Sequence, residues 1–493
     1  EKEAASRLLL EYGFSEPDKI LEEISAYRDS RQFLALEKIG RERLNRFMAV
    51  LLEAVSRSAT PDLAFTRVFS FVQHVTRRTS YLILLLENRV ALTQLIELCE
   101  ASPWVVDHLS KYPVLLDELL KPITVPPERD ELADDLRQNM IRLAGDDLDQ
   151  QMETLRYFKL VHVLKVAAAE LAETLPLMKV SDYLTYIAEV LLQQVLELAW
   201  DELVSRFGYP VDSKGEAGNL DFTVIAYGKL GGIELNYGSD LDLVFLHDGD
   251  ADCDTEAGEQ QRAINSRAFY ARLGQRIINI LNTWTMSGRL YEVDMRLRPS
   301  GASGLLVTSL AAFRRYQEQD AWTWEHQALI RSRAVGGSPH LAEEFSRIRK
   351  EVLKRRRDDS ELKKEICAMR RRMRKELGSG KRQRFNIKQD AGGLVDIEFM
   401  VQYIVLARAW QCEGLLAWSD NMRLLEVMKD QALLPVDQVQ SLMDIYIRYR
   451  IRLHRLALQN IDDDLPEDEY QEERACIIAI WQSLFPEDES GSE

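Results

Sequence analysis

Asp240 and Asp242 flank Leu241 at the start of a predicted β-strand. Because successive side chains of a strand point to opposite faces, both carboxylates project from one face. Adjacent carboxylates repel unless a cation lies between them, and Mg²⁺ takes such oxygen ligands together with substrate phosphates. Asp294, in a later predicted strand, would complete a set for two metal ions. Such a pair of ions clamps the attacking and leaving oxygens of a phosphoryl displacement. The spacing therefore predicts metal-dependent phosphoryl transfer.

Glycines precede these carboxylates. The segment 228–232 (GKLGG) follows the first predicted strand, and Gly238-Ser239 stands directly before Asp240. Glycine lets main-chain N–H groups approach phosphate oxygens closely. We therefore expect Gly228, Lys229, Gly238 and Ser239 to contact a nucleotide.

Two arginines follow Asp294 with the same strand parity. Arg296 and Arg298 are predicted to balance triphosphate charge or to orient the carboxylates. An isolated Asp-x-Asp is most simply a solvated strand end. The ordered combination of strand, glycine turn, Gly-Ser, Asp-x-Asp, helix and aspartate-bearing strand is far more specific, and it favours a catalytic site.

The elements that must position these residues form an α+β island in a helical chain. The predicted strands are Phe222–Ala226, Leu241–Leu246 and Leu290–Arg298, with a helix from about Gln260 to Trp284. Apolar residues at helical spacing dominate before and after the island. The predicted fold class is mainly α with an α+β island: a small mixed sheet flanked by helical bundles.

The N-terminal part shows the helical signals most clearly. Ala64, Val68, Phe71 and Val72 have the spacing of one apolar helix face. Three residues stand one or two positions before prolines, where N-caps are expected: Ser15, Thr60 and Ser102.

The expected domains are a helical linker or regulatory domain (1–125), a domain that contains the candidate phosphoryl-transfer site (126–345) and a C-terminal helical bundle with an acidic tail (346–493). Within the second, a helical lead-in (126–210) precedes the catalytic α+β part (211–345).

Composition limits the function. The 493 residues carry a net charge of −17, which disfavours non-specific nucleic-acid binding. Residues 347–384 hold 17 Lys or Arg against 6 Asp or Glu, while residues 461–493 hold 12 Asp or Glu and one Arg. The basic segment is either a solvated helix face or a docking surface for an acidic partner.

Five scattered cysteines without a CxxC pair predict reduced thiols and a cytoplasmic protein. No membrane-spanning run and no signal-peptide pattern is expected.

The motifs carry a resemblance. Gly228, Gly238-Ser239-Asp240-x-Asp242 and Asp294 resemble the DNA-polymerase-β-like nucleotidyltransferase superfamily, although many members have Gly or Ser where this chain has Lys229. Four longer strings are similar to bacterial glutamine synthetase adenylyltransferase: YGKLGGIELNYGSDLD (227–242), YEVDMRLRPSG (291–301), AWTWEHQA (321–328) and GGLVDIEF (392–399). That family carries two such halves, and this chain resembles the C-terminal, adenylylating one.

The resemblance implies a mechanism and partners. Mg-ATP, with two Mg²⁺ held by Asp240, Asp242 and Asp294, would donate AMP to a tyrosine of glutamine synthetase. Glutamine and a PII signal protein would regulate the reaction. Neither nucleic acid nor membrane is an expected partner.

Three other functions stay open: the phosphorolytic, deadenylylating half of the same enzyme, a PII uridylyltransferase, and a helical regulatory scaffold with an inert nucleotidyltransferase island.

Further residues have a functional and a structural interpretation. Arg331 and Arg333 either reach the ATP phosphates or are surface helix charges. Trp322 and Trp324 are predicted to pack in a core or a domain interface, with stacking on adenine as the alternative. Asp396 and Glu398 fit a helix N-terminus, with contact to the nucleotide site as the alternative.

Two motif fragments are excluded. His247-Asp248 lacks the clustered histidines of an HD phosphohydrolase, and the segment 378–382 departs from a P-loop at its first glycine and its Ser/Thr position.

Overall fold

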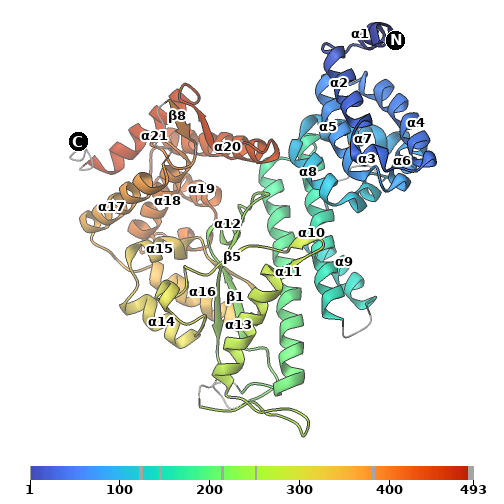
Figure 1. Cartoon of the computed structure of the whole chain (residues 1–493). Helices are drawn as coiled ribbons and strands as arrows, with labels where there is room; N and C mark the ends of the chain where they lie inside the picture. The colour runs from blue at the N-terminus through green and yellow to red at the C-terminus, as the bar shows by residue number, and fades with distance from the viewer. Residues whose placement is uncertain are drawn as a thin grey trace. The chain divides into compact units, whose positions relative to one another are not determined.

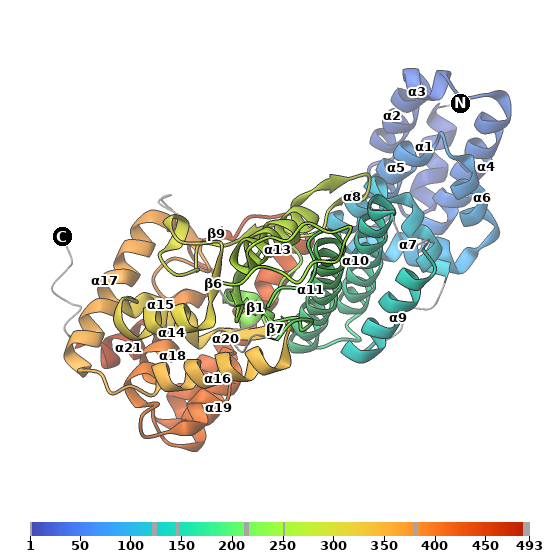
Figure 2. The same ribbon diagram turned by 90° about the horizontal axis from the view of Figure 1, so that it is seen from below.

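The computed structural model describes residues 2–120, 126–143, 147–211, 216–249, 252–378 and 383–486. Its contacts group the chain into two compact units (Figures 1 and 2). The first unit comprises Glu1–Pro126, Leu160–Pro176 and Arg455–Ile461, and the second comprises Pro127–Lys159, Leu177–His454 and Asp462–Glu493. Helices α10 and α20 each belong partly to both units. The expected domain boundaries at 125/126 and 345/346 remain a prediction.

The first unit is helical. Its elements are α1 (Lys2–Glu11), α2 (Pro17–Arg28), α3 (Arg31–Leu34), α4 (Lys38–Val55), α5 (Pro61–Val75), α6 (Thr79–Glu87), α7 (Arg89–Ala101), α8 (Pro103–Lys111), the 3₁₀ helix η1 (Pro113–Leu120) and part of α10 (Leu148–Leu171). The apolar face predicted for α5 is fully buried: Ala64, Val68, Phe71 and Val72 are each 0% exposed. Phe65 and Phe69 stack beside it, with ring centroids 5.2 Å apart. Apolar burial on this scale is the main stabilising contribution in such a bundle.

One of the three expected N-caps acts as a side-chain cap. Ser102 accepts a hydrogen bond from the Val105 amide at 3.2 Å, with Pro103 at the first helical position of α8. Thr60 is the N-cap of α5, but its hydroxyl donates to Glu100 instead. Ser15 precedes the actual N-cap of α2 and bonds to Asp62. For these two, a carboxylate on another element is the preferred partner.

The second unit contains the predicted sheet, with strand order β5-β2-β1-β7 and β6 also paired to β2. Its strands are β1 (Phe222–Ala226), β2 (Leu241–His247), β5 (Val293–Asp294), β6 (Val307–Ser309) and β7 (Arg333–Gly337). Strand β2 pairs antiparallel with β1 and parallel with β5 and β6. Two small ribbons lie outside the sheet: β3 (Trp284–Thr285) with β4 (Gly288–Arg289), and β8 (Arg384–Asn386) with β9 (Asp464–Pro466).

The second unit also contains helices, some on the sheet and others packed on further helices. They are α9 (Arg129–Ile141), α11 (Leu177–Phe207), α12 (Gly228–Gly231), α13 (Ser266–Asn282), α14 (Leu310–Gln319), α15 (Thr323–Ile330), α16 (Pro339–Leu353), α17 (Asp359–Leu377), α18 (Leu394–Arg408), α19 (Asn421–Asp430), α20 (Val436–Leu458), α21 (Gln471–Leu484) and the 3₁₀ helices η2 (Gly301–Ser303) and η3 (Glu413–Leu416). Both views place the sheet between α11 and α13 on one side and α14 and α16 on the other (Figures 1 and 2). The mainly α fold with an α+β island is confirmed.

The sequence interpretation was wrong in two places within the sheet. The predicted strand Leu290–Arg298 pairs only at Val293–Asp294, because the Asp294 carboxylate accepts the Arg296 amide at 2.8 Å and turns the chain. Strand β7 was missed, since the chain after the island was predicted to be helical throughout.

In the described part of the chain, no helix is long and apolar enough to cross a membrane.

Candidate active site

The three predicted catalytic carboxylates meet at the edge of the sheet where β2 begins. Parallel pairing of β2 with β5 sets Leu241 opposite Val293 and Asp242 opposite Asp294. Residues in register on neighbouring strands point to the same face, so these two carboxylates are neighbours. Asp240 directly precedes the strand and is exposed. Leu241, the residue between the two aspartates, is fully buried and anchors them.

Gly228 lies against Asp242. It begins the one-turn helix α12 with φ +57°, and a Cβ there would lie 2.2 Å from Asp242 Oδ2. The preceding residue, Tyr227, donates its amide to the Asp242 carbonyl at 2.9 Å. Only glycine combines this backbone conformation with this approach. Any side chain at residue 228 would therefore displace the Asp242 carboxylate.

The carboxylates of Asp240 and Asp294 lie close enough to Asp242 to repel its charge. Burial raises the pKa of Asp242 to about 6, and the charges of Asp240 and Asp294 act in the same direction. The pKa of Asp294 is lowered, chiefly because Arg296 donates a side-chain hydrogen bond to it. A divalent cation would relieve the repulsion between these groups, and carboxylate oxygens are the ligands that Mg²⁺ prefers.

The donor set therefore fits magnesium in its chemistry. Within the described residues, no three Asp, Glu, His or Cys side chains already converge as metal ligands. Part of the reason is that Asp294 is turned toward Arg296, with their Oδ2 and Nε atoms 2.7 Å apart.

The other predicted nucleotide contacts surround this edge. Lys229, on α12, is half-buried; desolvation and the neighbouring Lys388 lower its pKa, while Asp240 opposes the shift. Gly238 has open space on its Cα, whereas the Ser239 hydroxyl accepts the Asn236 amide at 3.0 Å and closes a turn. Lys229 and Gly238 thus lie beside the carboxylates, and the Ser239 hydroxyl is engaged within its own loop.

Arg296 and Arg298 do not share a strand face with Asp294, because the strand ends there. The Arg296 side chain is 82% exposed and pairs with Asp294. Arg298 donates instead to the carbonyls of Met295 and Ala302, at 2.7 and 3.0 Å. Arg296 can therefore move toward a ligand, and Arg298 stabilises the following turn.

Neither Arg331 nor Arg333 is a surface helix charge. Arg331 is 7% exposed and forms ion pairs with Glu234 and Glu398. Arg333 begins β7 and pairs with Glu189. The sequence could not show this, because both arginines find their partners on elements distant in the chain.

Sequence reasoning missed a buried ionic cluster next to this site. We call it the Arg331 network; its members are Glu234, Arg331, Glu398, Asn421 and Arg450. A weak signal existed, since two of its members lie within the unusual strings 227–242 and 392–399. Glu398 and Asp396 both lie in the first turns of α18, as predicted for a helix N-terminus.

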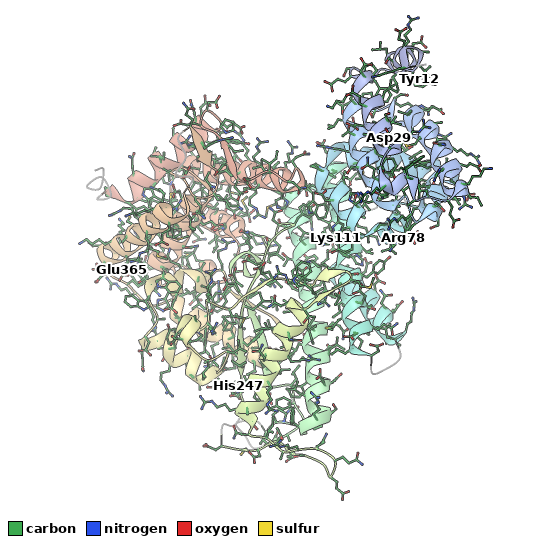
Figure 3. All side chains as sticks on the ribbon, in the orientation of Figure 1. Tyr12, Asp29, Arg78, Lys111, His247 and Glu365 are labelled. Atoms are coloured by element: carbon green, nitrogen blue, oxygen red, sulfur yellow. The ribbon has the colours of Figure 1, made fainter. Side chains whose placement is uncertain are left out.

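Two further residue types have a structural explanation. His247, labelled in Figure 3, ends β2 and stacks on Tyr270 with ring centroids 4.6 Å apart. Burial and the charge of Arg267 lower its pKa to about 4. Trp322 and Trp324 are 69% and 37% exposed, which contradicts packing in a core, while packing in a domain interface and stacking on adenine stay predictions.

Comparison with known proteins identifies the family of this chain. The sequence profile of the family described as glutamate-ammonia ligase adenylyltransferase matches residues 92–348, more than half of the chain. The profile of the GlnD PII-uridylyltransferase family matches residues 360–482.

Several curated relatives are similar over nearly the whole chain. "Bifunctional glutamine synthetase adenylyltransferase/adenylyl-removing enzyme" of Pseudomonas aeruginosa is 48% identical over 98% of this chain and 50% of its own length. The proteins of the same name from Hahella chejuensis and Pasteurella multocida are 47% and 44% identical, over 99% and 100% of this chain and 51% and 50% of theirs. The chain thus spans about half the length of the curated relatives it matches. It belongs to the glutamate-ammonia ligase adenylyltransferase family.

Proposed function

We propose that this chain transfers AMP from Mg-ATP to a tyrosine hydroxyl of glutamine synthetase. The observation that carries the proposal is the parallel pairing of β2 with β5, which sets Asp242 beside Asp294. Asp240 and the Gly228 turn adjoin this pair. The names of the relatives support the substrate, and the resemblance of strings 291–301 and 321–328 supports the adenylylating half.

Asp240, Asp242 and Asp294 are the residues that would hold Mg²⁺, two ions in this proposal. When bound, the metal supplies charge neutralisation for the triphosphate and the attacking oxygen. Lys229 and the main chain at Gly238 face the phosphates. Positioning and electrostatics then supply most of the catalysis.

In the transfer, the tyrosine oxygen forms a bond to the α-phosphorus, and the bond from that phosphorus to the bridging oxygen breaks. Pyrophosphate leaves with the electron pair. The hydroxyl proton passes to Asp294, and Arg296 must first release the Asp294 oxygen that it occupies. An exposed arginine that leaves a carboxylate is free to pair with the triphosphate.

Regulation by glutamine and a PII signal protein belongs to this proposal, on the family resemblance. So does a cytoplasmic location, which five free cysteines support.

Mass spectrometry of glutamine synthetase after incubation with this chain and Mg-ATP tests the proposal. We expect one AMP added to a tyrosine, with pyrophosphate released. Unmodified glutamine synthetase would refute the activity.

Further arms of this assay separate the alternatives. ADP released from adenylylated glutamine synthetase with phosphate and no ATP would identify the adenylyl-removing half. UMP transferred to PII from UTP would favour uridylylation, which the profile match over residues 360–482 makes worth testing. If calorimetry detects no binding of Mg-ATP, the chain is a scaffold.

A further inference from the structure

The α12 turn, which carries Lys229 beside the carboxylates, is held firmly from behind. Arg333 Nη2 donates to the Leu230 carbonyl at 3.0 Å, and Arg333 Nε donates to the Gly231 carbonyl at 3.2 Å. The Ser419 hydroxyl donates to the same Gly231 carbonyl at 2.7 Å. These bonds satisfy carbonyls that so short a helix leaves without partners of its own.

Glu234 connects this turn to the Arg331 network. Its amide donates to the Lys229 carbonyl at 2.8 Å. Its carboxylate accepts from Arg331 and from both the amide and the Nδ2 of Asn421 at 3.2 Å. The Glu234 main chain also accepts from Arg450 Nη2 at 3.2 Å. One residue thus joins Lys229 to helices α19 and α20.

Arg331 connects the same turn to α18. Its Nη1 lies 2.7 Å from Glu398 Oε1. A Cβ on Gly232 would lie 3.0 Å from the Arg331 guanidinium, and one on Gly231 would lie 2.0 Å from the Arg331 carbonyl. A displacement of Arg331 is therefore transmitted directly to the glycine turn.

The network is balanced in charge, and its members are buried except for Glu398, whose side chain is 17% exposed. Two carboxylates, Glu234 and Glu398, face two guanidinium groups, Arg331 and Arg450. Burial by itself would lower the pKa of Arg331, but Glu234 and Glu398 raise it above its ordinary value. Removing one partner of such a group leaves a buried charge that must be accommodated by movement.

We propose that Glu398 is a positioning residue for nucleotide binding: through Arg331 and Glu234 it fixes the α12 turn and places Lys229 against the triphosphate of Mg-ATP. This inference rests on the proposed function for the identity of the nucleotide. It assigns a role in the active site to α18, a helix in the C-terminal region that matches a different family profile.

A matched control exists on the same helix. Asp396, two residues before Glu398, is also buried and pairs with Arg370 at 2.6 Å and with Arg374 at 3.0 Å, both on α17. Asp396→Asn therefore breaks a buried ion pair of α18 whose partners, Arg370 and Arg374, are not members of the Arg331 network. Comparing it with Glu398→Gln separates positioning from general stability.

The experiment measures the Kd of the 493-residue chain for Mg-ATP by calorimetry, with thermal unfolding recorded for each variant. We expect Glu398→Gln to raise this Kd by about tenfold or more, and Asp396→Asn by no more than about twofold at a similar loss of Tm. In the transfer assay, the KM for ATP should rise in Glu398→Gln while the KM for glutamine synthetase stays unchanged. Arg331→Lys should act in the same direction, and the double variant should be no worse than the more affected single one.

Equal effects of Glu398→Gln and Asp396→Asn on the Kd would overturn the proposal, as would no effect of either. If Glu398→Gln does not fold, Glu398→Asp is compared with Asp396→Glu in the same measurement. A wild-type chain that binds Mg-ATP but leaves glutamine synthetase unmodified refutes the proposed function alone, and the Kd comparison still decides the role of Glu398. A wild-type chain that does not bind Mg-ATP refutes both.

Discussion

The second unit contains two groups of carboxylates that the fold treats in opposite ways. Asp240, Asp242 and Asp294 lie at an edge of the sheet and crowd one another, so that the pKa of Asp242 rises to about 6. Glu234 is buried and Glu398 is partly buried, and Arg331 and Arg450 hold the pKa of Glu234 below its ordinary value against the effect of burial.

Under the proposed function, the three aspartates serve chemistry and the Arg331 network serves the fold. A buried carboxylate is tolerated when a guanidinium neutralises it, and breaking such a pair is costly. A cluster of carboxylates at an edge lowers stability unless a cation arrives, so its retention points to a ligand. Four variants of this chain test these assignments.

The largest effect is expected from Asp242→Asn. Loss of one ligand to the proposed metal should reduce AMP transfer by about 10³-fold or more. The Tm should stay unchanged or rise, because the variant removes a repelled charge. Transfer is followed by mass spectrometry and stability by thermal melting. The exposed Asp201→Asn, on α11, is the matched control. Full transfer by Asp242→Asn would remove Asp242 from the site.

The next effect concerns the glycine that touches this carboxylate. Gly228→Ala places a Cβ against Asp242 at a positive φ, so we expect about 10²-fold slower transfer and a stability loss of about 1–3 kcal/mol. Gly238→Ala meets no atom within 4 Å and should leave the Tm unchanged. Similar melting of the two variants would show that the turn yields more easily than its geometry indicates.

A third substitution concerns a buried cation whose surroundings are cationic. Lys159 donates to the Leu290 carbonyl and lies 3.8 Å from the Tyr291 ring centroid. Burial, with Arg289 and Arg156 nearby, lowers its pKa to about 7. From about pH 7 to 10, the unfolded chain holds a proton on this amine that the folded chain lacks. The free energy of unfolding should therefore rise with pH across this window.

Lys159→Met should flatten that rise, by at most about 1.4 kcal/mol per pH unit. Urea unfolding at pH 7, 8 and 9 measures both slopes. Parallel slopes for wild type and variant would place the amine in a more polar environment than the structure gives it.

The smallest effect is expected on the basic surface. Within the described part of segment 347–384, Arg349 and Arg370 are buried and bond to internal acceptors. Other side chains of α17 are exposed: Lys364, Arg372 and Lys375. Reversing these three to glutamate should change the unfolding free energy by less than about 0.5 kcal/mol, because surface charges contribute little.

AMP transfer by this triple variant should stay within about twofold of wild type. A several-fold loss of affinity for glutamine synthetase that shrinks with added salt would instead establish the docking interpretation.

The strands that carry the candidate carboxylates could be predicted from the sequence. Strand periodicity and chain order were enough to predict β1, most of β2 and the meeting of Asp242 with Asp294. Alternation within a strand is a local property. The two aspartates were matched by the order of their motifs, although α13 and the β3–β4 ribbon lie between them along the chain.

The partners of the arginines became known only from the tertiary structure. Arg296 bonds to the Asp294 carboxylate two residues before it. Arg333 begins β7, a strand in a region that was predicted to be helical. Arg331 is buried between Glu234 and Glu398. The partners of Arg331 are 97 and 67 residues away in the chain, and no periodicity records which distant faces will meet. Whether a charged residue binds substrate or supports the fold depends on its burial and its partners, and both are set by packing.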